Sequence, residues 1–191
     1  MANGTEDIRN MINKIYHIAD VHIRNVKRHK EYRQVFRRLY SYIKKTKTEN
    51  DLIYVAGDIA HSKTEMSPEL VDLTSEFFAN LADLLPTIVI LGNHDCNLNN
   101  NYRLDALSPI VKAIKHKNLH YLKDNGVYNI QGVHFNVMAV DEKPIKYIQA
   151  KDFEGDYKIA LHHGSVHNAS TDAGFTLSNT HVTTDIFVGH D

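Results

Sequence analysis

Residues 52–61 read Leu-Ile-Tyr-Val-Ala-Gly-Asp-Ile-Ala-His, an apolar run that ends in a glycine, a carboxylate and a histidine. The apolar residues are continuous rather than alternating, which is typical of a strand that is covered on both faces. The glycine lets the backbone turn sharply away from the strand. This stretch therefore predicts a buried strand whose carboxyl end presents Asp58 and His61.

Similar stretches recur along the chain, each a strand-like run followed by a short polar motif. The further motifs are Asp20-Val21-His22, Gly92-Asn93-His94-Asp95, Leu161-His162-His163-Gly164 and Gly189-His190-Asp191. Ligands of open α/β sheets bind beyond the carboxyl ends of the strands, so we expect these motifs to converge. When such a motif occurs alone, it usually forms an ordinary turn, and its histidines belong to the core or to the solvent-exposed surface. The ordered set indicates a site.

Strand-like and helix-like segments alternate over the first two thirds of the chain, which predicts an α/β fold. The expected strands cover residues 15–19, 52–56 and 87–91, and the expected helices cover 32–43, 67–85 and 103–116. Further strands at 128–130, 133–140, 158–161 and 184–188, with short connections, predict a second sheet with antiparallel pairings. We expect one domain over residues 1–191, incomplete at its C-terminus because a buried strand is followed by an abrupt stop.

The composition is 42% hydrophobic and 24% charged, which fits a globular protein and excludes disordered, collagen-like and disulfide-rich chains. Cys96 is the single cysteine, so an internal disulfide is excluded and a reducing compartment is expected, cytoplasmic or nuclear. An acidic N-terminus without an apolar core argues against secretion, and there is no apolar run of about 18 residues for a membrane span.

The motifs offer carboxylates, an amide and several imidazoles, which is a mixed set of oxygen and nitrogen ligands. Such a set suits manganese, iron, zinc or magnesium. Because no motif contains a thiolate, a structural zinc site is disfavoured. The sequence therefore predicts a catalytic rather than a structural metal centre.

The order Asp-x-His, Gly-Asp-x-x-His, Gly-Asn-His-Asp and a later histidine resembles the calcineurin-like metallophosphoesterase superfamily. This resemblance implies a two-sheet β-sandwich flanked by helices, in four αββα layers, and two divalent metal ions, with manganese the first choice. Residues 17–23, a basic stretch and Glu31-Tyr32 at the start of a helix are most similar to the SbcD-type nucleases of double-strand-break repair. That subfamily implies DNA as substrate, an SbcC-type ATPase partner and a homodimer.

The resemblance also implies ligand roles. Asp20 and His22 would hold one metal ion, Asp58 would bridge both, and Asn93 and His162 would hold the second. His162 is preferred to His163 because the family's histidine directly follows its strand. The family usually closes the site with Gly-His-x-His, and here His190 is either a ligand or precedes a closing motif beyond residue 191. Either way residues 1–191 lack at least one ligand of the family's set, and reduced activity of this chain is expected.

Three further residues would act on the phosphate in this resemblance. His94 would protonate the leaving oxygen or stabilise the transition state, Asp95 would orient the His94 ring, and His61 would be a second phosphate-facing or outer histidine. Water activated by the metals would be the nucleophile, so no serine or cysteine is needed. The chain is thus expected to be a metal-dependent hydrolase of phosphodiester bonds.

Charge bears on the substrate, since ten of the twenty-two basic residues lie within residues 24–47, opposed only by Glu31. We expect the helix in this segment to present Arg33, Arg37 and Lys44 to solvent and to contact nucleic-acid phosphates. The plain alternative is a solvated helix face. A phosphatase or cyclic-nucleotide phosphodiesterase would instead have a narrow pocket. A non-catalytic binding module would lack His61 and His94, and both are present.

Overall fold

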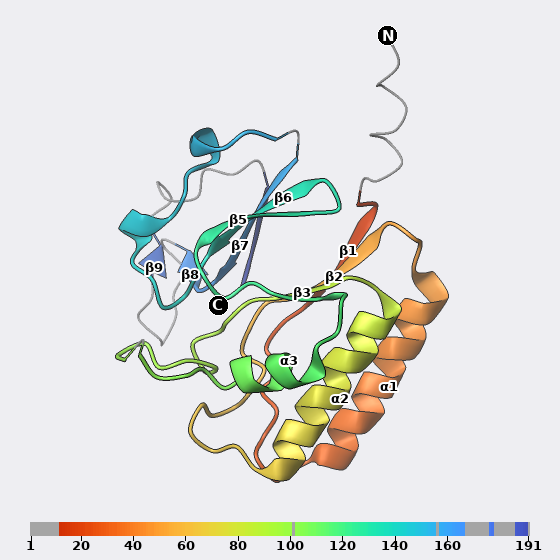
Figure 1. Ribbon diagram of the computed structural model, residues 1–191. Coiled ribbons are helices and arrows are strands. Elements are labelled where there is room, and N and C mark those ends of the chain that lie inside the picture. Colours follow the sequence, from red (N-terminus) through yellow and green to blue (C-terminus); the bar gives the residue numbers. More distant parts are fainter. Residues whose placement is uncertain (1–11, 101, 156, 167–175, 178–185, 191) are drawn as a thin grey trace.

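In the described part of the chain, two four-stranded sheets pack face to face, and three α-helices cover the outer face of the first (Figure 1). The computed structural model describes residues 12–100, 102–155, 157–166, 176–177 and 186–190. The first sheet is parallel throughout, in the order β1 (Lys14–Ile18), β2 (Asp51–Val55), β3 (Thr87–Val89) and β4 (Leu119–Tyr121). Its strands therefore end at one common edge.

The helices are α1 (His29–Thr46), α2 (Pro68–Leu84) and α3 (Ser108–Ile114). The spacing of apolar residues that predicts the first helix is confirmed, with Phe36 and Ile43 buried. The start of α2 is confirmed as well, because the Ser67 hydroxyl accepts a hydrogen bond from the Leu70 N–H at 3.2 Å. None of the described helices combines the length and the apolar character that a membrane span requires.

The second sheet has the order β10 (Ile186–His190), β7 (Lys158–His163), β6 (Val133–Met138) and β5 (Gly126–Ile130). A second sheet is thus confirmed, but among the strands that the structure describes antiparallel pairing holds only for the β5–β6 hairpin. β6 with β7 and β7 with β10 run parallel. The short strands β8 (Ser165–Val166) and β9 (Thr176–Leu177) pair separately.

Strand β2 shows why the apolar run is continuous. Ile53 and Val55 pack against the helices, whereas Leu52, Tyr54 and Ala56 pack between the two sheets. Both faces of β2 are buried, so the two-sheet α/β fold is confirmed. On the outer face of the second sheet, the described residues form the short 3₁₀ helices η2 (Pro144–Lys146) and η3 (Ala150–Asp152) rather than α-helices.

The structure differs from the expected elements at two places. The helix expected over residues 103–116 begins only at Ser108, because the Asp105 carboxylate accepts hydrogen bonds from the N–H groups of Leu107 and Ser108 and ends the preceding loop. Strand β4 is not predicted, since it has three residues and only Leu119 among them is buried. Neither difference alters the edge where the polar motifs lie.

Candidate metal centre

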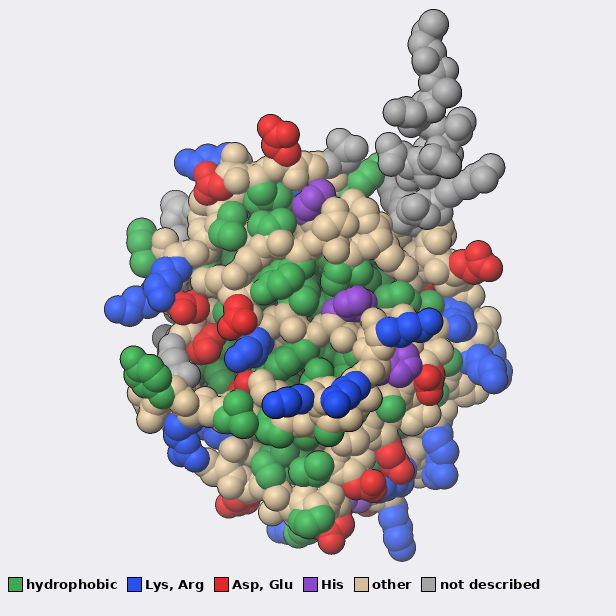
Figure 2. Space-filling model, viewed as in Figure 1, with side chains coloured by type: hydrophobic (Ala, Val, Ile, Leu, Met, Phe, Trp, Pro, Cys, Tyr) green, Lys and Arg blue, Asp and Glu red, His purple; other side chains and the backbone are tan. Residues whose placement is uncertain are grey.

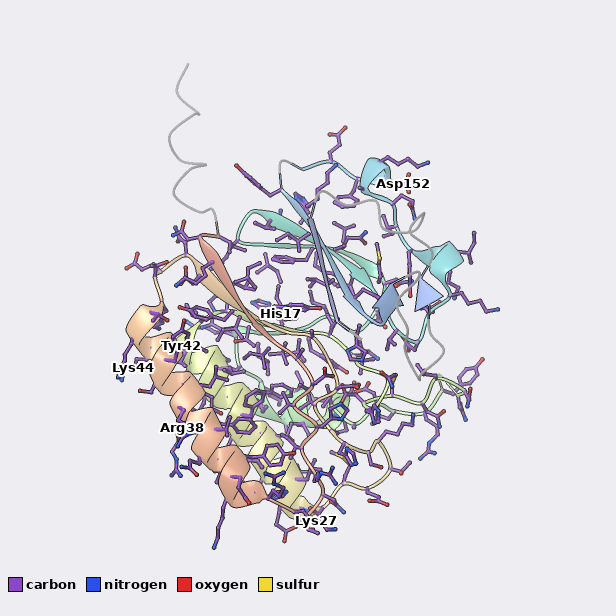
Figure 3. The ribbon with its side chains drawn as sticks, turned by 180° about the vertical axis from the view of Figure 1, so that it is seen from behind. His17, Lys27, Arg38, Tyr42, Lys44 and Asp152 are labelled. Atoms are coloured by element: carbon purple, nitrogen blue, oxygen red, sulfur yellow. The ribbon has the colours of Figure 1, made fainter. Side chains whose placement is uncertain are left out.

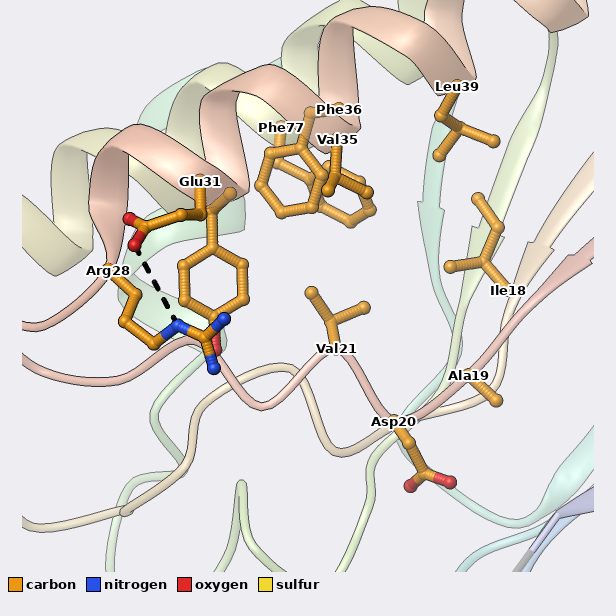
Figure 4. Close-up of a pocket in the computed structure, with 11 residues that line it drawn as sticks. Ile18, Ala19, Asp20, Val21, Arg28, Glu31, Val35, Phe36, Leu39 and Phe77 are labelled. Carbon is orange, nitrogen blue, oxygen red and sulfur yellow. Dashed lines mark ion pairs between the residues drawn. The ribbon is translucent and has the colours of Figure 1, made fainter.

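The loop after β1 carries Asp20 and His22 in the left-handed backbone region, with φ of 51° and 46°. Val21, between them, points toward α1 into a pocket of about 360 Å³, while the Asp20 carboxylate points the other way (Figure 4). The Tyr32 hydroxyl donates to the His22 carbonyl at 2.6 Å. Left-handed conformations cost these residues energy and cluster at functional sites. The loop is thus held by α1 in a shape that turns two ligand-type side chains outward from the pocket.

The loops after β2 and β3 approach each other through two glycines. A Cβ on Gly57 would lie 2.5 Å from the Gly92 nitrogen, and a Cβ on Gly92 would lie 2.1 Å from Asp58 Oδ1. Asp58 also has a left-handed backbone, with φ of 52°, and its Oδ1 accepts the His94 N–H at 2.8 Å. Only glycine leaves room for this carboxylate between the two loops.

The buried Asp95 carboxylate links the same two loops through hydrogen bonds to their backbone. Its Oδ1 accepts the N–H groups of Ile59 and Ala60 at 3.0 and 2.9 Å, and its Oδ2 accepts that of Gly92 at 3.0 Å. Burial raises the pKa of Asp95 to about 7, although the Ala60 and Gly92 hydrogen bonds oppose the rise. Asp95 was expected to orient the His94 ring, but its carboxylate accepts these backbone N–H groups instead.

His94 is positioned by a different group. Its Nδ1 lies 3.0 Å from the His61 carbonyl oxygen, so the ring is fixed by the β2–α2 loop. The ring centres of His94 and His22 are 4.8 Å apart, and that of His61 is 5.8 Å from His22 and 6.2 Å from His94. His61 and His94 therefore lie together beside His22, and their role toward a phosphate stays a prediction.

The second sheet contributes a histidine through β7, which continues to His163. Side chains alternate along a strand, so His163 shares the inward face with Ile159 and Leu161. His163 Nε2 lies 2.9 Å from Asn93 Oδ1 and 3.4 Å from Asp58 Oδ2, and its Nδ1 lies 2.7 Å from the Ala56 carbonyl oxygen. The structure thus brings His163 to the polar edge.

His162 lies on the opposite face of β7. Its Nδ1 is 2.8 Å from the Met138 carbonyl oxygen and its ring meets Tyr147 edge-on. Burial lowers the pKa of His162 to about 4. The expected preference for His162 assumed a strand ending at Leu161, and the longer strand turns this side chain away from Asn93.

A continuous chain of contacts joins the remaining predicted residues. Asp20 Oδ1 is 3.6 Å from His22 Nε2, which is 3.4 Å from Asp58 Oδ2, and Asp58 Oδ2 is in turn 3.4 Å from His163 Nε2. Three other predicted metal ligands are therefore linked to Asp58: His22 directly, Asp20 through His22, and Asn93 through His163. His190 lies opposite His163 in the β7–β10 pairing, but its side chain is outside the described residues.

Lys63 was not singled out from the sequence. Its Nζ donates to the Asn93 carbonyl at 3.3 Å, which brings a cation to the rim of the cluster. The signal was its position two residues after the Gly-Asp-x-x-His motif. The structure adds Lys63 to the residues that an anion would meet here.

The charged groups polarise one another. Burial favours the neutral Asp58 carboxyl, but the hydrogen bond and charge of His163 outweigh it and lower the pKa of Asp58. Burial alone would lower the pKa of His163, yet Asp58 raises it. The pKa of His22 is lowered, chiefly by burial. A negative carboxylate that attracts a proton onto His163 attracts a metal cation equally well.

The arrangement fits divalent cations. His22, Asp58 and His94 offer ligand atoms within 4.8 Å of one another, and His22 Nδ1 is buried without a hydrogen-bond partner. The Ala56 carbonyl oxygen holds Nδ1 of His163, and Nε2 faces Asn93 and Asp58; a carbonyl partner on the far ring nitrogen is common among ligating histidines. Carboxylate, amide and imidazole groups are together suited to borderline metals.

The model of the calcineurin-like phosphoesterases matches residues 13–191. The chain belongs to this family. It therefore carries a metal-dependent phosphoesterase domain. "Uncharacterized protein R555" of Acanthamoeba polyphaga mimivirus is 44% identical over 195 residues, covering 97% of this chain and 14% of that protein. The chain thus spans about one seventh of the length of this viral relative.

Among solved structures, a nuclease MPE of Pseudomonas putida matches 80% of the phosphoesterase chain and 61% of its own chain. The TM-score is 0.41 and the sequence identity is 18%. The ligand geometry described above is independent of this match.

Proposed function

We propose that this phosphoesterase is a two-metal phosphodiesterase of the SbcD type, a DNA exo- or endonuclease acting in repair or recombination. One observation carries the proposal: the Asp58 carboxylate lies within 3.4 Å of both His22 and His163, which belong to two different ligand sets. A carboxylate between two sets is the arrangement needed to bridge two ions about 3.5–4 Å apart.

The ligands divide naturally between the two sides of Asp58. Asp20 and His22 would complete one set, and Asn93 and His163 the other. When bound, two such metal ions lower the pKa of water and neutralise charge on the phosphate. Both ions are proposed to be manganese, with magnesium, iron and zinc as alternatives. His190 stays a predicted ligand.

The remaining residues act on the substrate. His94, held at Nδ1 by the His61 carbonyl, keeps Nε2 free to give a proton to the leaving oxygen. Lys63 draws the phosphate toward the Asn93 loop. Asp95 is a positioning residue, since its three accepted hydrogen bonds fix the loops that carry Asp58 and His94.

The partners are part of the same proposal. DNA would be the substrate, an SbcC-type ATPase the associated subunit, and a homodimer the assembly. The proposal of these partners rests on the subfamily similarity of residues 17–32. The proposal of phosphoester hydrolysis does not rest on that similarity.

Two measurements test the proposal. With manganese, the protein should hydrolyse bis-p-nitrophenyl phosphate and cut oligodeoxynucleotides, while p-nitrophenyl phosphate, a monoester, is a poor substrate. Hydrolysis of the monoester alone would contradict the proposal and indicate a phosphatase. Cleavage of cyclic nucleotides without oligonucleotides would indicate a cyclic-nucleotide phosphodiesterase.

The second measurement distinguishes a general-acid role of His94 from a metal-ligand role. His94→Ala should lower turnover by about 10²–10⁴-fold, the contribution of a general acid, while calorimetric titration finds manganese bound as in the unmodified protein. Equal loss of manganese in this variant would contradict the acid role.

A further inference from the structure

The outer face of α1 is strongly basic. Lys30, Arg37, Arg38, Lys44 and Lys45 are all exposed there. Seen from behind, Arg38 and Lys44 stand along the outer side of the helix, and Lys27 lies near its start (Figure 3). Basic side chains project along the same margin in the space-filling view (Figure 2). These residues form one surface, which we call the α1 ridge.

The ridge has a regular geometry. Residues three and four apart are neighbours on a helix surface, so Arg37, Arg38, Lys44 and Lys45 surround the exposed Ser41. Lys30, Arg37 and Lys44 are each seven residues apart, a nearly straight line along the helix. With a rise of about 1.5 Å per residue, the line from Lys30 to Lys44 is about 21 Å long.

The ridge charges are not used to hold the fold together. Within the described part of the chain, none of the five ridge cations forms an ion pair. Arg33 is the contrast, because its guanidinium pairs with Asp72 and Glu76 of α2 at 2.9 and 3.0 Å. Arg33 is therefore only partly exposed to solvent and pairs with α2, so it is not part of the ridge.

The charge is also segregated along the chain. Residues 24–47 hold ten of the twenty-two basic residues and one acid, Glu31, while the remainder holds twelve basic and twenty-two acidic residues. Such a concentrated positive region creates a field that attracts a polyanion. Gln34 and Ser41 lie among the ridge cations, and the exposed Val35 and Tyr42 lie along one margin of the ridge.

We propose that the α1 ridge binds the phosphate backbone of a nucleic acid, outside the metal centre. The inference rests on the proposed function, because the helix begins seven residues after His22 and its ridge leads away from that ligand loop. A polynucleotide on the ridge therefore continues toward the metals. This makes the preferred substrate a long nucleic acid rather than a small phosphodiester.

Salt dependence of binding tests the ridge without any metal. Anisotropy of a labelled 20-nucleotide single strand is titrated in EDTA at several sodium chloride concentrations. Each phosphate contact contributes about 0.7 to the log–log slope for single strands, so Arg37→Ser/Arg38→Ser should flatten the slope by about 1.4 and weaken binding roughly ten-fold or more. Lys112→Ser/Lys117→Ser, an equal charge change elsewhere on the surface, should alter the slope little.

A site-specific reporter gives an independent readout, because the chain contains no tryptophan. Ser41→Trp should lose fluorescence when the oligonucleotide binds, whereas Tyr157→Trp, at a half-exposed position in the second sheet region, should not. Equal slopes for the two charge variants, together with equal or absent quenching, would overturn the inference. Hydrolysis of bis-p-nitrophenyl phosphate by the unmodified protein tests the proposed function separately, so either idea can fail alone.

Discussion

The two sheets contribute to the metal centre in different ways. The first supplies its groups from loops beyond strand ends, and three of them, Asp20, His22 and Asp58, have left-handed backbones. The second supplies His163 from within β7, where the strand pleat alone aims the side chain. A loop residue is therefore placed by turn geometry and its supports, whereas a strand residue is placed by its parity along the strand.

The strained backbone conformations of the metal centre lie in the loops of the first sheet. Left-handed backbones at non-glycine residues cost of the order of 1–3 kcal/mol each. Asp95, Gly57 and Gly92 offset that cost by fastening the loops after β2 and β3 to each other. Changes in these loops should therefore affect the metal centre more than equivalent changes in the turns of the second sheet.

The largest expected effect is at Asp58, where the two halves meet. Asp58→Asn removes the charge that both proposed ligand sets share, so manganese affinity should fall at both sites and turnover by about a thousand-fold, equal to about 4 kcal/mol. Calorimetry and diester hydrolysis measure the two losses. Loss at one site only would show that Asp58 does not bridge.

Gly92 gives the next effect and sharpens the comparison. Gly92→Ala places a Cβ 2.1 Å from Asp58 Oδ1 and should lower activity by roughly ten- to a hundred-fold through displaced ligands. Gly132→Ala, in the β5–β6 turn, has no atom within 4 Å of the added Cβ.

The Gly132 variant is the matched control. Its left-handed backbone should cost about 1–2 kcal/mol in urea unfolding, with the manganese affinity unchanged. If both alanine variants lowered metal affinity equally, the difference drawn between the two sheets would be wrong.

The sequence predicts the fold and the loop residues well, for a physical reason. Continuous apolar strands, the Ser67 cap and the glycines before Asp58 and Asn93 are local signals, and local signals specify turns at strand ends. The choice between His162 and His163 is not local. It depends on how far β7 extends, which is set by pairing with its two neighbours: Met138 of β6 lies opposite His162, and His190 of β10 lies opposite His163.

Two further residues illustrate the same limit. Asp95 accepts hydrogen bonds from backbone N–H groups as many as thirty-six residues away. The sequence predicted instead that it contacts the ring of its neighbour His94, because those distant groups are not visible in a local motif. Arg33 pairs with acids on α2, and the charge pattern of α1 alone does not reveal this. Both contacts arise only when separate segments are packed together.

The smallest expected effect is at Tyr32, which supports the first ligand loop. Tyr32→Phe removes one hydrogen bond, to the His22 carbonyl, and should destabilise the fold by about 1 kcal/mol. Manganese affinity should fall several-fold at the Asp20–His22 side only. Urea unfolding and calorimetry measure these changes, and an unaltered metal affinity would mean that the loop keeps its shape without α1.

The central claim is that two sheets build one centre around Asp58, and manganese stoichiometry tests it most directly. Calorimetry compares the unmodified protein with His163→Ala and His162→Ala, with circular dichroism to confirm that each variant is folded. We expect manganese binding at two sites in the unmodified protein and in His162→Ala, and loss of one site in His163→Ala. Full binding by His163→Ala together with loss by His162→Ala would contradict the account.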